Sequence, residues 1–266
     1  MKRAWLTPTS IVGLLVLYAA LYVWQPGGSR LLEIISNTLY MLFAVLATIF
    51  AWRASQMFEP GVVQRRVWLL CSISMAMWVI AETLWAYYRL FTREGSPYPS
   101  PADILWAIGY IPIIVSMVMQ YRALGTGTSI RLKLIALALY LGLLVAAFVT
   151  VLWPILSSPG EDSVIETFLN LYYPIGDLCL AFIATLSLLV LWSGLVGQPW
   201  RYIVISMLLV ALADLTFSYT MWNDTYIIGG NLLSGVADMA YLSAHILATV
   251  GAYRQATLSL PSWSVE

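Results

Sequence analysis

Eight long apolar stretches decide what this chain of 266 residues can fold into. Each approaches the ~20 apolar residues that a helix needs to cross the hydrocarbon core of a bilayer. Because lipid offers no hydrogen-bond partners, a stretch of this kind satisfies its own backbone as a helix. We therefore predict an all-α integral membrane protein with eight transmembrane helices, and a count of seven would omit the first. The stretches cover approximately residues 9–25, 31–53, 66–91, 101–121, 132–153, 166–192, 201–221 and 232–253.

Composition and charge agree with this fold class. The chain is 61% hydrophobic and 10% charged, against about 25% charged in an average soluble domain. The formal net charge is zero, so the lipid bilayer is the expected partner and nucleic acid is not. If the N-terminus is cytoplasmic, all but three of the 13 Lys and Arg residues lie on the cytoplasmic side, the exceptions being Arg30, Arg89 and Arg93. This bias predicts a multi-pass protein of the inner (cytoplasmic) membrane with both termini in the cytoplasm.

An internal repeat links residues 81–110 with residues 213–245. AETLWAYY and SPADILWAIGY in the first segment correspond to ADLTFSYT and SGVADMAYLSAH in the second, and AVLAT (44–48) corresponds to AFIAT (181–185). An even number of helices in each unit gives both the same orientation. We therefore predict one membrane domain made of two parallel four-helix repeats, residues 1–130 and 131–266. Chance similarity between apolar helices is the alternative.

Each repeat carries a pair of acids. Glu82 and Asp214 lie inside apolar helices. Inserting a carboxylate into a membrane helix costs ~2.5–3.5 kcal/mol even on the translocon-insertion scale, which gives the lowest cost. Asp103 and Asp238 follow in the next helix of each repeat, and Ser100 before Asp103 is a good helix cap. We expect these acids to share a protein-lined polar site that binds a ligand or a proton. The alternatives are capping for Asp103, and hydrogen bonds that hold helices together for the others.

A fifth acid and the single histidine extend this candidate site. Asp177 lies beside Pro174 and Gly176, which predict a kink that frees carbonyl groups next to a polar pocket. His245 aligns with Tyr110 of the first repeat, and a lone membrane histidine is more often a packing residue than a catalyst.

Aromatic residues lie near the acids, either as core packing or as the walls of a pocket for an amphiphilic, cationic or polyene ligand. One His and two Cys do not form a zinc site, no catalytic group is predicted, and no feature identifies a cofactor. The predicted ligand-binding residues are Glu82, Asp103, Asp177, Asp214, Asp238, His245, Trp85, Trp106 and Tyr241.

Three segments carry a family resemblance. SPYPSPADILWAIGYIP (96–112), NLYYPIGDLCLAF (170–182) and GVADMAYLSAHILA (235–248) resemble the multi-helix N-terminal sensor module of bacterial and archaeal diguanylate cyclases, phosphodiesterases and histidine kinases. The likeness covers residues 64 to 253 and implies a membrane bundle that senses a stimulus for an output domain. No output domain is evident in this sequence, so we expect action through a partner subunit or a homo-oligomer.

These observations favour a non-enzymatic sensor or interaction subunit that binds a small or lipidic ligand in an outward-facing acidic and aromatic pocket. A weaker resemblance to the lysoplasmalogenase family rests on eight spans and the Tyr-x-x-Ala-His run at 241–245. It implies a membrane-embedded lipid hydrolase in which Glu82, Asp177, Asp214 and His245 surround a lipid head group and activate water. A small transporter, supported by the repeat, is the third possibility.

Overall fold

The computed structural model describes residues 7–92, 97–124, 129–158, 163–191 and 197–258, which are helical with no strand among them. Seven of the helices in these ranges are long and apolar enough to cross a membrane, and an eighth apolar helix, α1, has 17 residues. The predictions of an all-α fold and of a multi-pass membrane protein are therefore confirmed. The elements are α1 (Pro8–Trp24), α2 (Gly28–Gln56), α3 (Val63–Phe91), α4 (Pro101–Leu124), α5 (Ile130–Ala147), the π-helix η1 (Phe148–Leu152), α6 (Trp153–Ser157), α7 (Val164–Leu191), α8 (Gln198–Trp222) and α9 (Leu232–Thr257).

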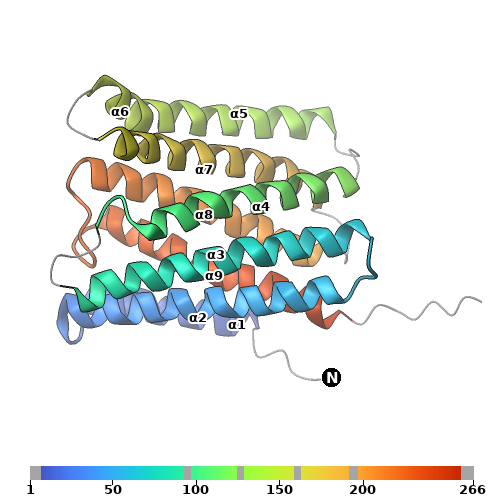
Figure 1. The fold of residues 1–266 in the computed structure, drawn as a ribbon, viewed down its shortest axis with the longest axis horizontal. Coiled ribbons are helices and arrows are strands. Elements are labelled where there is room, and N and C mark those ends of the chain that lie inside the picture. The colour runs from blue at the N-terminus through green and yellow to red at the C-terminus, as the bar shows by residue number, and fades with distance from the viewer. Residues whose placement is uncertain (1–6, 93–96, 125–128, 159–162, 192–196, 259–266) are drawn as a thin grey trace, which may run out of the picture.

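Six helices form a closed ring in which each packs against the next, in the order α2, α3, α4, α7, α8, α9 and back to α2. In Figure 1 their axes run roughly side by side, with α1 and α5 at opposite margins of the bundle. α1 packs against α9, and α5 packs against α7. We call α2–α4 the first half and α7–α9 the second half, and the contacts α4–α7 and α2–α9 the two seams between them.

Small residues and hydroxyl groups bring the ring helices close together. Ala47, Ala51 and Ala54 recur along one side of α2 and are almost completely buried. At the α2–α9 seam the Thr249 hydroxyl donates to the Phe43 carbonyl at 2.8 Å. Small side chains and interhelical hydrogen bonds are the usual means of helix association in lipid, where no hydrophobic effect drives it.

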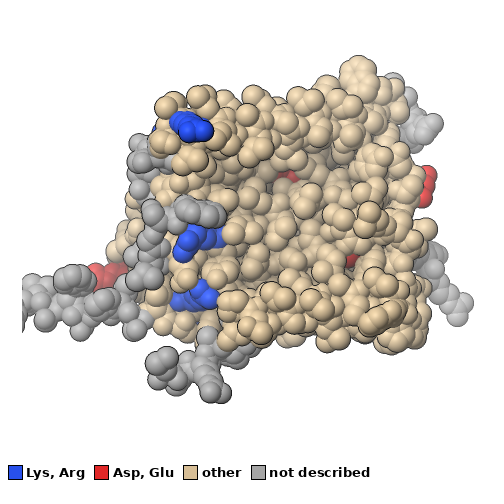
Figure 2. Space-filling model, turned by 180° about the vertical axis from the view of Figure 1, so that it is seen from behind, with Lys and Arg blue, Asp and Glu red and all other residues tan. Residues whose placement is uncertain are grey.

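The outer surface is apolar and most of the basic residues gather at one end. The space-filling view from behind shows few charged atoms on the sides of the bundle (Figure 2). Most of the basic side chains that are visible in this view lie near one end. α5 carries highly exposed apolar residues, including Ile130 and Leu139 at 71% and 70% exposure, as a lipid-facing helix does. According to the helix directions, the residues at that basic end are Arg53, Arg65, Arg66, Arg122, Arg131, Lys133, Arg201 and Arg254.

Two prolines lie inside helices beside the α4–α7 seam, Pro112 in α4 and Pro174 in α7. A proline within a helix removes a backbone donor and disturbs the carbonyl four residues earlier. Carbonyls of α4 in this region accept bonds from side chains of neighbouring helices. The donors are the Tyr172 hydroxyl to Ala107 at 2.7 Å, the Ser74 hydroxyl to Gly109 at 2.7 Å and the Trp78 indole to Trp106 at 3.3 Å.

Candidate functional site

Four side chains from four helices form the centre of the site. The Tyr110 hydroxyl of α4 donates to Asp177 Oδ1 of α7 at 2.5 Å and lies 3.2 Å from Asp214 Oδ2 of α8. Tyr241 of α9 donates its hydroxyl to Asp214 Oδ1. The side chains of Asp177 and Asp214 also lie within hydrogen-bond reach of each other. We call these four residues the acid–tyrosine cluster.

Local packing holds the Tyr110 ring at the α4–α7 seam. A Cβ atom on Gly176 would lie 3.1 Å from two carbons of that ring, so the absence of a side chain at Gly176 allows the close approach. The edge of the Tyr110 ring also meets Trp78, with ring centroids 5.9 Å apart and an angle of 69° between the planes. Tyr110 is buried as a result, and its hydroxyl is fixed over the two acids.

The two acids differ in burial. Asp177 is fully buried and Asp214 is half-buried. Asp177 Oδ2 is without a hydrogen-bond partner among the residues that the structure describes. An unsatisfied buried polar atom costs about 1–3 kcal/mol, and more when the group is charged. Such an atom calls for an explanation by function or by a bound group, which makes this cluster the candidate site.

Glu82 of α3 extends the cluster on one side. The Trp106 side chain lies beside its carboxylate, which is also close enough to Asp214 for an electrostatic interaction. The rings of Trp85 and Trp106 contact each other with centroids 5.7 Å apart. The structure therefore brings together Glu82, Asp177 and Asp214, with Trp106 between α3 and α4.

Asp103 has a local role at the start of α4. The backbone N–H and the hydroxyl of Ser100 donate to Asp103 Oδ2 at 2.7 and 2.8 Å, as in a capping box. Tyr173 of α7 donates to Asp103 Oδ1 at 2.9 Å. Capping therefore accounts for the position of Asp103, and Tyr173 adds a contact across the α4–α7 seam.

Asp238 of α9 forms a separate group with three tyrosines. Tyr22 of α1 and Tyr226 of the α8–α9 loop donate to its two carboxylate oxygens, each at 2.9 Å. Tyr40 of α2 donates to the Asp238 carbonyl at 3.1 Å. Burial, followed by the nearby Asp238 carboxylate, raises the pKa of the Tyr226 phenol above its ordinary value. The predicted site residues thus fall into two groups and do not surround one pocket.

His245 lies beside a small, partly open cleft. Its Nδ1–H donates to the Tyr241 carbonyl at 2.8 Å, and its ring stacks on Tyr40 with centroids 6.0 Å apart. Together with Ser206 and Trp78 it borders a cavity of about 30 Å³. This volume suits one or two water molecules, whereas pockets for drug-sized ligands measure about 300–1,000 Å³. His245 therefore packs between aromatic neighbours at the edge of a water-sized space.

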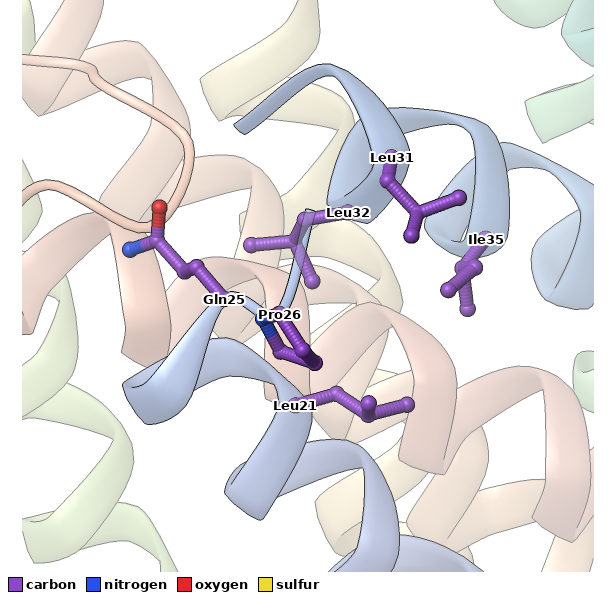
Figure 3. Close-up of a pocket in the computed structure, with 6 residues that line it drawn as sticks. All are labelled: Leu21, Gln25, Pro26, Leu31, Leu32 and Ile35. Carbon is purple, nitrogen blue, oxygen red and sulfur yellow. The ribbon is translucent and has the colours of Figure 1, made fainter. Parts of the chain in front are cut away.

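A second cleft lies between α1 and α2 and has a volume of about 10 Å³ (Figure 3). Its lining is apolar except for Gln25, whose amide is directed away toward a neighbouring loop and donates to the Gly229 carbonyl at 2.6 Å. The cleft has room for no more than a single water molecule. The residues around it are Leu21, Gln25, Pro26, Leu31, Leu32 and Ile35.

Metal binding and similarity to known proteins add no further guide to function. Within the described part of the chain, no group of three or more His, Cys, Asp and Glu residues is arranged to hold a metal ion. No protein-family model, curated protein or solved structure matches the chain. The functional argument therefore rests on the geometry of the acid–tyrosine cluster.

Proposed function

We propose that this chain is a non-enzymatic sensor or interaction subunit of the membrane, in which buried acid–tyrosine contacts couple the two halves of the helix ring. The observation that carries the proposal is the position of Tyr110, whose hydroxyl reaches across the α4–α7 seam to Asp177 and Asp214. Tyr40 makes the corresponding polar contact across the α2–α9 seam. A change at one buried acid therefore acts on the contact between the halves, as a two-state element requires.

We further propose that eight spans form two parallel repeats, α1–α4 and α5–α9. The matched contacts support this reading, because Glu82 pairs with Trp106 in the first unit as Asp214 pairs with Tyr241 in the second. The six-helix ring has the same order of contacts in each half. The contacts at the two seams also correspond. Tyr110 bonds to Asp177 at the α4–α7 seam, and the His245 ring stacks on Tyr40 at the α2–α9 seam.

The proposed orientation places the basic end of the bundle in the cytoplasm of an inner membrane, according to the positive-inside rule. The opposite end then carries Asp103 and Asp238, near the starts of α4 and α9. Half-buried Glu82 and Asp214 are partly accessible, which supports entry of a small signal or ligand from the outer side.

A sensor fits the site better than a lipid hydrolase does. A hydrolase must place a lipid head group and a water molecule against its acids and its histidine. The cavity next to His245 measures about 30 Å³, and the Nδ1–H of this histidine is bonded to a backbone carbonyl. These features support a site that responds to a very small ligand.

Distances between the halves test the sensor proposal. In a variant without Cys71 and Cys179, spin labels at the exposed positions Tyr87 of α3 and Ile165 of α7 report across the α4–α7 seam. Labels at Tyr87 and Ile104 report within the first half and serve as the control. The protein is reconstituted in phosphatidylcholine bilayers with and without anionic lipid, each at neutral and at alkaline pH.

A sensor is expected to show two distances across the seam, with populations that differ between these conditions, while the control distance stays constant. A single unchanged distance across the seam under every condition contradicts the proposal. Release of product from a lysophospholipid, lost in Asp177→Asn, would contradict the non-enzymatic assignment and favour the hydrolase.

A further inference from the structure

We propose that Asp177 and Asp214 share one bound proton, and that this proton is the ligand of the acid–tyrosine cluster. The inference rests on the sensor function proposed above and names the signal that the sensor reads. It follows from hydrogen-bond counting, from an unsatisfied buried atom and from the space available.

Hydrogen-bond counting gives the first argument. The Tyr110 hydroxyl has one hydrogen, which its 2.5 Å contact assigns to Asp177 Oδ1. Asp214 Oδ2 lies 3.2 Å from the same hydroxyl oxygen. An ionised carboxylate only accepts, so in a fully ionised pair Asp177 Oδ1 and Asp214 Oδ2 compete for this one hydrogen, and Tyr241 satisfies only the other oxygen of Asp214. One proton on the pair supplies the missing donor.

The unsatisfied atom gives the second argument. Asp177 Oδ2 is fully buried and without a partner among the described residues when both acids are carboxylates. The two side chains are nevertheless within hydrogen-bond reach of each other. A proton between them turns two facing acceptors into a donor and an acceptor. It also removes one of two like charges from a poorly solvated interface, where their repulsion is strong.

The available space gives the third argument. The cavity of about 30 Å³ is lined by other residues and does not include Asp177 or Asp214 in its walls. A metal ion needs several ligands at once, and no such set occurs in the described ranges. A proton requires neither a cavity nor further ligands, and Asp214 is only half-buried.

Other titratable groups surround the pair. Glu82 of α3 lies beside the Trp106 side chain, and His245 of α9 donates to a backbone carbonyl. The remaining neighbours are phenols that donate to acids or carbonyls. The titratable groups that face the pair from the helices around it are Glu82, Tyr110, Tyr172, Tyr173, Tyr241 and His245.

Loss of the proton has a structural consequence. Both carboxylates then carry a charge and compete for the Tyr110 hydroxyl, so Asp177 and Asp214 repel each other. Their helices, α7 and α8, belong to the second half, whereas Tyr110 belongs to the first. Deprotonation therefore separates the two acids that the Tyr110 hydroxyl bridges, so it changes the contact across the α4–α7 seam, which is what the sensor proposal requires.

Infrared spectroscopy tests the proton directly. Spectra of the full chain in bilayers at neutral pH are recorded for wild type and for the double variant Asp177→Asn with Asp214→Asn. Asparagine keeps the size of the side chain and an acceptor for Tyr110, and unfolding experiments on each single variant and on the double variant check that the fold is retained. Asp103→Asn is the matched control, because donors already occupy both oxygens of this buried carboxylate.

The spectrum of wild type minus the double variant is expected to contain one carboxylic-acid C=O band, shifted in ²H₂O, and one carboxylate band. The control difference, in which the pair is untouched, should lack this combination of one acid band and one carboxylate band. Two carboxylate bands, or two acid bands, in the first difference would overturn the shared proton. That result would leave the sensor proposal standing, because the distance measurement across the seam tests it independently.

Discussion

Replacing Tyr110 with phenylalanine removes one hydroxyl group and keeps the ring that packs against Gly176 and Trp78. Asp177 Oδ1 then loses its donor at 2.5 Å, and only the proton shared with Asp214 remains as a partner for the carboxyl group. A typical hydrogen bond between membrane helices contributes only ~0.6 kcal/mol. A buried polar group left without partners costs ~1–3 kcal/mol. We therefore expect Tyr110→Phe to lower the free energy of unfolding by ~2 kcal/mol, about 30-fold in the unfolding equilibrium.

Tyr172→Phe is the matched control. The Tyr172 hydroxyl donates to the Ala107 carbonyl at 2.7 Å across the same seam, but Tyr172 is half-buried and does not contact an acid. Its loss should cost ~0.6 kcal/mol. Reversible unfolding of both variants in bicelles, against the wild type, gives the two values.

A double-mutant cycle separates the Tyr110–Asp177 contact from general damage. Asp177→Leu in the Tyr110→Phe background removes both partners, so no polar atom of this pair is left unsatisfied. The double variant should cost at least ~1 kcal/mol less than the sum of the two single variants. Additive effects, or a cost for Tyr110→Phe no larger than that for Tyr172→Phe, would refute the reasoning.

Three further outcomes follow from the structure. Gly109→Ala should destabilise the fold by ~1–3 kcal/mol, because the added Cβ would lie 2.6 Å from Trp78 Cδ1. Gly142→Ala, with open space around the added Cβ, should not destabilise it, and thermal unfolding compares the two variants. Asp103→Ala should cost ~0.5–2 kcal/mol and speed hydrogen exchange in the first turn of α4, and unchanged exchange there would contradict the capping role. Burial raises the pKa of Tyr226 in the folded state, so the stability that this residue contributes is complete below about pH 10 and falls as the pH rises further. Tyr226→Phe should flatten this fall in the free energy of unfolding, and equal slopes against pH in the variant and the wild type would contradict the prediction.

The helices were predictable because hydrocarbon imposes both length and apolarity. The apolar stretch 9–25 corresponds to α1 (Pro8–Trp24), and 232–253 corresponds to α9 (Leu232–Thr257). The helix ends were less predictable, because they depend on polar residues that lie beyond the apolar windows. The side chain of Asn231, for example, accepts from the Ser234 N–H and fixes the start of α9.

The acids of the site were visible in the sequence because a carboxylate inside an apolar helix is rare and costly. Their tyrosine partners were not identifiable in the same way. Tyr22 and Asp238 are 216 positions apart in the chain, and the chain contains 16 tyrosines whose commonest membrane role is at the interfaces. The assignment of Tyr110 to both Asp177 and Asp214 depends on how α4, α7 and α8 pack, which a single sequence does not encode locally.

The most direct test of the central claim combines the two proposals in one measurement. Spin labels at Tyr87 and Ile165 are compared at neutral and at alkaline pH, in wild type and in the double variant Asp177→Asn with Asp214→Asn. The account predicts that the distance across the α4–α7 seam changes with pH in the wild type and stays constant in the double variant, which cannot lose the shared proton. A distance that is independent of pH in the wild type, or an equal change in both proteins, would contradict it.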